Sequence, residues 1–306
     1  MTISNPTVST PETQFYTWKG YRCAYSVHFP TDGTTEGIPL LLIHPIGVGL
    51  SRQFWQRFCR EWHNKGYRNP IYNPDLLGCG ESDKPRVAYT PTDWAEQLKY
   101  YIETVIQKPV IALAQGGLTP VAVSLTQFAP DKIRALVLSG APGWAIITKE
   151  TPAWQHKVSW NLFDSPLGKA FYRYARRRQF LQSFSIKQLF ENANSVDGEW
   201  LDTLEKGAAN LDTRYAVFSF LAGFWRKNYQ GAIASISQPT LVIVGEKATN
   251  ISREGKQEPP RQRLSKYLEY LQNGQGRIIS GRNVLPYEST AEFVASVAEF
   301  VATIKV

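Results

Sequence analysis

The chain has 306 residues, a net charge of +8, and 43% apolar and 20% charged residues. This length suffices for one large domain with an insertion or for two domains, and the composition excludes a wholly disordered, collagen-like or coiled-coil chain. The sequence contains no run of 18 apolar residues, which argues against a membrane-spanning helix.

The N-terminal segment and the cysteines indicate the cellular compartment. Residues 1–14 are polar and contain neither a basic nor an apolar stretch, so we expect a disordered leader rather than a signal peptide. Cys23, Cys59 and Cys79 follow no disulfide or zinc-site spacing, as is typical of reducing compartments. We therefore predict a cytoplasmic protein without disulfides.

The first predicted element is an antiparallel hairpin over residues 15–29, with a turn at Lys19-Gly20. Short apolar runs typical of buried strands follow at 38–44, 69–75, 109–114, 134–140, 239–245 and 276–281. Helical patterns lie at 51–65, at 92–106 with a start at Thr92 and Asp93, at 117–129, and at 289–304. This alternation predicts a parallel, doubly wound sheet.

The alternation of strands and helices stops between residues 143 and 230, where aromatic-rich, helix-forming sequence predominates. We therefore predict a core domain made of residues 15–142 and 231–306, with 143–230 as a helical insert. The charged stretch 252–263 is predicted to be a solvated loop that leads into a helix.

Three turn motifs in register are similar to those of the α/β-hydrolase superfamily. They are HPIGVG at 44–49, DLLGCGES at 75–82 and the small-residue turn ALAQGG at 112–117. The resemblance implies an oxyanion loop, an Asp-x-x-Gly-x-Gly-x-Ser loop and a nucleophile elbow, respectively. It implies an α/β-hydrolase fold: a mostly parallel, doubly wound sheet with an N-terminal antiparallel hairpin and a helical lid at 143–230.

A dinucleotide-binding fingerprint is the rival interpretation of the first turn. Gly47 and Gly49 follow a strand and precede a helix, and Asp75 ends the next strand. The third glycine position is Arg52, and the motif does not explain the other two turns. We therefore disfavour nucleotide binding.

The resemblance also assigns the three residues of a catalytic triad, and each position holds an apolar residue. The nucleophile position aligns with Ala114, the acid with Ala248 and the histidine with Val284. The last histidine of the chain is His156, inside the insert, so no shift of alignment supplies a base. The sequence thus predicts loss of triad-type hydrolysis.

Backbone donors of an oxyanion hole do not depend on those side chains. The resemblance places them at Gln115 and Ile46, with His44 and Gly116 at the edge of the same pocket. His44 is either a free general base or, as is usual in the family, a brace for the oxyanion loop. We favour the brace.

The remaining candidates for chemistry are weaker. Asp75 and Ser82 belong to a loop that relatives keep for structural reasons, and Cys79 would need a nearby base to act as a nucleophile. Glu246 and Glu288 flank the acid and histidine positions and could form a surviving polar pair, but we favour salt bridges to the neighbouring Lys247 or Arg282. No metal-ligand spacing or phosphate loop occurs in the sequence, so we predict no metal and no cofactor.

The insert contains five of the nine tryptophans. Four of them, Trp144, Trp154, Trp160 and Trp225, are predicted to roof a hydrophobic pocket over Ala114, which favours a hydrophobic small molecule or lipid as ligand. Residues 157–190 contain seven basic residues and one acid, with interleaved aromatics. This segment either forms solvated lid helices, which we favour, or binds an anionic membrane or a protein partner. Nucleic-acid binding is disfavoured because no known module is present.

Three functional hypotheses follow. The favoured one is a catalytically silent protein that binds a hydrophobic small molecule, a lipid or a protein partner. The second is a lyase, isomerase or non-triad hydrolase that uses the backbone donors with His44, Glu246 or Glu288. The third is a peripheral membrane or scaffold protein that docks through residues 157–190.

Overall fold

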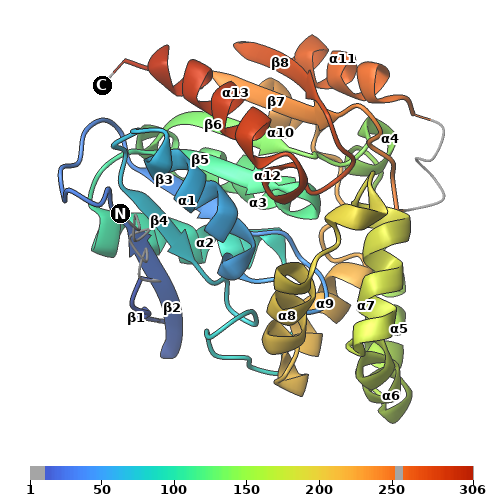
Figure 1. Ribbon diagram of the computed structural model, residues 1–306. Helices are drawn as coiled ribbons and strands as arrows, with labels where there is room; N and C mark the ends of the chain where they lie inside the picture. Colours follow the sequence, from blue (N-terminus) through green and yellow to red (C-terminus); the bar gives the residue numbers. More distant parts are fainter. Residues whose placement is uncertain (1–10, 252–257, 306) are drawn as a thin grey trace.

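The computed structural model describes residues 11–251 and 258–305, and within them a single eight-stranded sheet forms the centre of the molecule (Figure 1). The strands are β1 Gln14–Trp18, β2 Tyr21–His28, β3 Leu40–Ile43, β4 Ile71–Pro74, β5 Val110–Gln115, β6 Ile133–Ser139, β7 Thr240–Gly245 and β8 Gly274–Ile279. Their order is β1-β2-β4-β3-β5-β6-β7-β8. From β4 to β8 all neighbours are parallel. The predicted sheet and all of its predicted strands are confirmed.

The predicted N-terminal hairpin is also present. β1 pairs with β2 in antiparallel register, and Lys19 and Gly20 both have positive φ, as a tight two-residue turn requires. β2 then pairs antiparallel with β4 and attaches the hairpin to the parallel sheet. Residues 1–10 of the expected leader lie outside the described residues, and β1 begins at Gln14, one residue before the predicted start of the hairpin.

Two helical layers cover the sheet. The helices outside the insert are α1 Gln56–Asn64, α2 Pro91–Tyr101, α3 Thr119–Phe128, α11 Pro260–Tyr270, α12 Leu285–Glu288 and α13 Thr290–Ala302. One apolar cluster includes side chains of α2, α3 and α11, and the other includes side chains of α1 and α13. Successive residues of β3 alternate between the two, with Leu41 in the first cluster and Leu42 in the second. This alternation explains why the strand is apolar throughout.

The start of α2 differs from the prediction. The N-cap is Thr90 rather than Thr92, and Pro91 is the first helical residue. The Thr90 hydroxyl accepts a hydrogen bond from the Asp93 backbone N–H (3.2 Å), and the Asp93 carboxylate accepts one from the Thr90 N–H (2.9 Å). This reciprocal capping box satisfies two donors that the helix start would leave unpaired, so it decides where the helix begins.

A helical insertion separates β6 from β7. Its helices are α4 Trp144–Ile147, α5 Ala153–Phe163, α6 Pro166–Ala175, α7 Arg178–Phe184, α8 Gly198–Gly207, α9 Arg214–Leu221 and α10 Gln230–Ala234. Figure 1 shows α5, α6 and α7 projecting away from the sheet. Across the described ranges, no helix combines the length and the apolarity that crossing a bilayer requires.

Candidate functional site at the carboxyl edge of the sheet

The sharp turn after β5 is centred on Gly116. Ala114 lies inside β5, fully buried, and pairs with Ile43 of β3 and Leu138 of β6. Gly116 has a φ of +63° and is followed by a short 3₁₀ turn and then α3. The expected strand-to-helix turn therefore exists, but the assignment of Ala114 to its apex is wrong. A residue held in the ladder by both neighbours cannot adopt the turn conformation, whereas glycine adopts a positive φ at little cost.

The shift of the turn also moves the backbone donor that sequence reasoning assigned to Gln115. Gln115 is the last residue of β5 and pairs with Ser139 of β6. The residue after the turn is Gly117, so its N–H, not that of Gln115, occupies the place of the family's oxyanion donor. Ile46, the other expected donor, lies half-buried in the loop after β3. A Cβ built on Gly116 would meet no atom within 4 Å, so the turn faces open space.

His44 is a brace and not a free base. Its Nε2 accepts a hydrogen bond from the Leu76 backbone N–H (3.1 Å), so its Nδ1 carries the proton and donates to the Pro45 carbonyl (2.8 Å). The ring is fully buried, and this burial lowers the pKa of His44. The neutral imidazole ties the loop after β3 to the loop after β4, and neither nitrogen is available for proton transfer.

The protein should lose stability in mild acid because of His28. Burial lowers the pKa of His28 to about 4, below its ordinary value near 6.5. As pH falls through this interval the unfolded chain binds protons before the folded one, so stability is present above about pH 6.5 and is lost toward pH 4. His28→Gln should flatten the fall of the urea midpoint between these pH values. A parallel pH profile in the variant would contradict the assignment.

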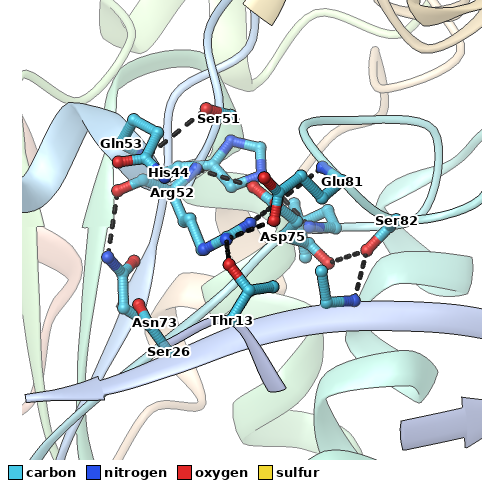
Figure 2. A network of polar contacts seen from close by, with 12 residues as sticks. Thr13, Ser26, His44, Ser51, Arg52, Gln53, Asn73, Asp75, Glu81 and Ser82 are labelled. Carbon is cyan, nitrogen blue, oxygen red and sulfur yellow. Dashed lines mark hydrogen bonds and ion pairs between the residues drawn. The ribbon is translucent and has the colours of Figure 1, made fainter. Parts of the chain in front are cut away.

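A buried ion pair lies beneath the His44 loop (Figure 2). The Asp75 carboxylate accepts hydrogen bonds from the backbone N–H of Arg52 (2.8 Å) and of Glu81 (2.8 Å) and pairs with the Arg52 guanidinium. Ser82 donates from its hydroxyl to the Asp75 carbonyl (2.9 Å). Asp75 therefore ties the loop after β3 to the loop after β4, and Ser82 braces the latter loop internally. Arg52 occupies the place where a dinucleotide fingerprint needs glycine.

Cys79, in the same loop as Asp75, is buried, and burial raises the pKa of its thiol. A thiol in this state is a poor nucleophile because the thiolate is the reactive form. Among the described residues, no group of three or more His, Cys, Asp or Glu side chains is arranged to hold a metal ion.

The positions assigned to the acid and the histidine lie in the turns after β7 and β8. Ala248 and Val284 are both buried, and Val284 belongs to the apolar cluster that includes α13. Between them Asn283 links the turns: its carbonyl accepts from Gln115 Nε2 (2.7 Å), and its Oδ1 accepts from the Thr249 N–H (3.3 Å). Its Nδ2 donates to the carbonyl of Gln188 in the insert (2.7 Å).

Sequence reasoning missed this role of Asn283. The signal available was its place directly before Val284, but nothing local shows that β5, β7 and the insert meet there. Two atoms near this junction, Gln115 Oε1 and Ser139 Oγ, are buried and have no hydrogen-bond partner among the described residues. Such atoms are costly to leave unpaired, so this junction contains polar groups that the fold buries without satisfying.

Glu246 and Glu288 do not form the surviving polar pair that the sequence suggested. Glu288 accepts hydrogen bonds from the backbone N–H of Arg282 (2.9 Å) and of Asn192 (3.2 Å), so it anchors the insert to the turn after β8. Glu246 is exposed and lines an open cavity of about 420 Å³. The other residues lining this cavity are Glu191, Lys247, Ala248, Thr249, Pro260 and Arg282. The lining is largely charged, unlike the apolar floor expected at Ala248.

The four tryptophans predicted to roof the pocket lie in different surroundings. Trp225 stacks on Phe220 (ring centroids 5.0 Å apart), and Phe220 lies so close to Gly117 that a Cβ there would overlap its ring. Trp160 packs edge-on against Phe224 (6.0 Å) in the insert. The other two contradict the prediction: Trp144 stacks on Tyr270 of α11 (4.7 Å), and Trp154 is exposed.

Comparison with known proteins identifies the family. The sequence model of the alpha/beta hydrolase family matches residues 40–297. Because this match covers most of the chain, the chain belongs to the alpha/beta hydrolase family. Its order of strands, antiparallel hairpin and helical insertion are an α/β-hydrolase fold.

The alignment with curated relatives spans only part of each protein. An uncharacterized protein of Mycobacterium tuberculosis (strain ATCC 25618 / H37Rv) and one of Mycobacterium bovis (strain ATCC BAA-935 / AF2122/97) are each 29% identical to the chain. Each alignment spans 164 residues, which is 53% of this chain and 42% of the relative. The chain thus matches less than half of the length of these relatives.

Solved structures match over nearly the whole chain. An esterase from Thermogutta terrifontis superposes with a TM-score of 0.70 at 16% identity, covering 97% of this chain and 100% of the esterase. A serine hydrolase involved in carbazole degradation superposes with a TM-score of 0.73 at 17% identity, and the match covers 96% of this chain and 99% of the hydrolase. An enol-lactonase from Burkholderia xenovorans LB400 superposes with a TM-score of 0.69 at 14% identity, and the match covers 94% of this chain and 100% of the lactonase. At these identities the likeness concerns the fold alone.

Proposed function

We propose that this chain is a non-hydrolytic member of the alpha/beta hydrolase family that binds a hydrophobic small molecule or lipid at the carboxyl edge of the sheet. The observation that carries the proposal is the turn after β5. Its apex is Gly116, which has no side chain to serve as nucleophile. Ala248 and Val284 supply neither acid nor base, and His156 is the last histidine in the sequence.

The loss of all three groups matters more than the loss of one. A serine nucleophile attacks an ester only when a histidine takes its proton and an acid orients that histidine. Enzymes that lose triad members retain only a small residual acceleration, which comes from the oxyanion hole and substrate binding. Here the backbone turn persists, so a ligand carbonyl or hydroxyl can still bind beside Gly117.

Binding is supported by what surrounds the turn. Phe220 and Trp225 bring aromatic surface next to Gly117, while Gln115 Oε1 and Ser139 Oγ bring two unpaired polar atoms to the ends of β5 and β6. The aromatic surface beside the turn suits a largely apolar compound.

The alternative of a lyase, isomerase or non-triad hydrolase finds less support. Its bases were to be His44, Glu246 or Glu288. Both nitrogens of His44 are engaged in hydrogen bonds, and the Glu288 carboxylate is occupied by backbone N–H groups. Only Glu246 is free of such contacts among the described residues, and it lies in an open, charged cavity.

The ligand is tested by extraction. The protein is purified gently from its native host, and an organic extract is compared by mass spectrometry with a mock purification. We expect an apolar compound in stoichiometric amount. An extract without an enriched compound would contradict small-molecule binding and favour a protein partner instead.

The absence of hydrolysis is a separate prediction. We expect the purified chain to hydrolyse no member of a panel of esters and lactones above the buffer rate, and to remain unlabelled by a fluorophosphonate that reacts with activated serines. Turnover that this reagent inhibits would contradict the proposal.

A pair of variants controls this experiment and tests the position of the turn. Gly116→Ser combined with Ala248→Asp and Asn283→His should gain fluorophosphonate labelling, because residue 283 lies between the turns after β5 and β7 whereas Val284 is buried in the apolar cluster that includes α13. Ala114→Ser with the same two changes should not, because residue 114 is buried within β5. Thermal unfolding of both variants shows whether each one is folded.

A further inference from the structure

Helices α5 and α6 bear a second apolar face that the fold does not use. Their inward faces pack on the insert: Phe163 stacks on Phe218 (4.9 Å between centroids), and Tyr172 meets the same ring edge-on (5.7 Å). The Tyr172 hydroxyl also shares a hydrogen bond with Thr213 (2.7 Å). These contacts account for the attachment of the two helices to the rest of the insert.

The outward faces are apolar as well. Six large side chains lie there at helical spacing, three on each helix, and each is at least two-fifths exposed. They are Trp154 (65% exposed), Val158 (60%), Leu162 (60%), Leu167 (73%), Phe171 (43%), whose ring also stacks on Phe218 (6.4 Å between centroids), and Tyr174 (53%). We call these six residues the outer stripe. A surface helix of a globular protein normally presents polar side chains to water, and clustered exposed apolar residues mark an interaction surface.

Basic side chains lie on the same two helices. Lys157, Lys169 and Arg173 are exposed, and among the described residues none has a carboxylate partner. Lys169 and Arg173 each lie two residues from Phe171, so they are on the other side of α6 from the stripe. The single acid of 157–190, Asp164, is paired with Arg86 (2.9 Å). The two helices therefore carry uncompensated positive charge.

The stripe continues into a groove of the same character. Tyr174, its last residue, also lines an open cavity of about 390 Å³ between α6 and α7. Arg177 and Lys187 line the cavity together with the rings of Phe180 and Phe184. Cations beside aromatic rings suit an anionic headgroup at the boundary between water and acyl chains.

We propose that the outer stripe docks on the surface of an anionic lipid bilayer. Apolar and aromatic side chains enter the interface, while Lys157 and the two cations that line the cavity beside Tyr174, Arg177 and Lys187, meet acidic headgroups. A protein partner with acidic side chains is the competing occupant, but the stripe lies on a projecting part of the molecule (Figure 1) that a flat surface can reach. This inference does not rest on the function proposed above.

The test is cosedimentation of the full chain with vesicles of phosphatidylcholine containing about 30% phosphatidylserine. We expect binding at low salt, weaker binding at 0.5 M NaCl, and none with phosphatidylcholine alone, because screening weakens attraction to the headgroups. Failure to bind the acidic vesicles at low salt would overturn the proposal.

Variants assign the binding to the stripe. Trp154→Gln with Leu167→Gln should weaken binding at least about tenfold with an unchanged unfolding midpoint, since both side chains lie mostly in water. Lys157→Gln, Arg177→Gln and Lys187→Gln together should weaken it and reduce its salt dependence. Phe29→Gln, an exposed aromatic outside the insert (54% exposed), should bind like the wild type. Unchanged binding in the Trp154/Leu167 variant would overturn the proposal, as would a dimer in solution that this variant dissociates while vesicles are not bound.

Discussion

Replacing Asp75 with alanine should destabilise the protein by about 3 to 5 kcal/mol, the usual cost of removing one partner of a buried ion pair. Asp75 and Arg52 are both fully buried, and the carboxylate also accepts the backbone N–H groups of Arg52 and Glu81. The variant leaves the guanidinium buried with its main partner gone and two backbone donors unsatisfied. The urea midpoint measures the loss.

Two further variants separate this effect from a general effect of charge. Glu81→Gln removes the other acid bound to Arg52 (2.7 Å), but Glu81 is half-exposed, so we expect a loss within about 1 kcal/mol. Arg52→Leu with Asp75→Leu should recover part of the stability that Asp75→Ala loses, because no charge is left unpaired. Equal midpoints for Asp75→Ala and Glu81→Gln would show that the pair is not buried as described.

Replacing Gly207 with alanine should loosen the insert and destabilise the protein by about 2 to 3 kcal/mol, the range for overpacking a close contact. The end of α8 and the loop after β3 approach so closely that a Cβ on Gly207 would overlap the carbonyl of Gly49. A Cβ on Gly49 would in turn overlap the carbonyl of Leu204. Backbone must move to relieve such overlaps, so we also expect faster limited proteolysis within the insert.

Gly198→Ala is the matched control in the same helix. A Cβ on Gly198 would meet nothing within 4 Å, so this variant should lie within about 0.5 kcal/mol of the wild type. If Gly207→Ala matched Gly198→Ala in midpoint and in proteolysis, the close contact between the insert and the loop after β3 would be refuted.

The strands and their succession along the chain could be predicted from the sequence. Buried parallel strands need continuous apolar runs, and the six predicted runs became β3 to β8. The Lys19-Gly20 turn was readable because few residues adopt a positive φ. The assignment of the acid and histidine positions to Ala248 and Val284 stays a prediction from local motifs.

The site itself required the tertiary structure. The small-residue run 112–117 fits the turn in more than one register, and only the pairing of Ala114 with β3 and β6 places the apex at Gly116. Helical spacing showed that the insert carries apolar faces, but not which face packs inward. This is why Trp154 was expected inside and is exposed.

What the sequence by itself determined was therefore the set of elements and the turn motifs, since each depends on neighbours along the chain. Only the tertiary structure decided the apex at Gly116, the junction at Asn283, the pairing of Arg52 with Asp75 and the outer stripe of α5 and α6. Each of these depends on contacts between segments far apart in the sequence, or on which face of a helix remains exposed to solvent. A local pattern of residue types specifies neither the contacts nor the exposed face.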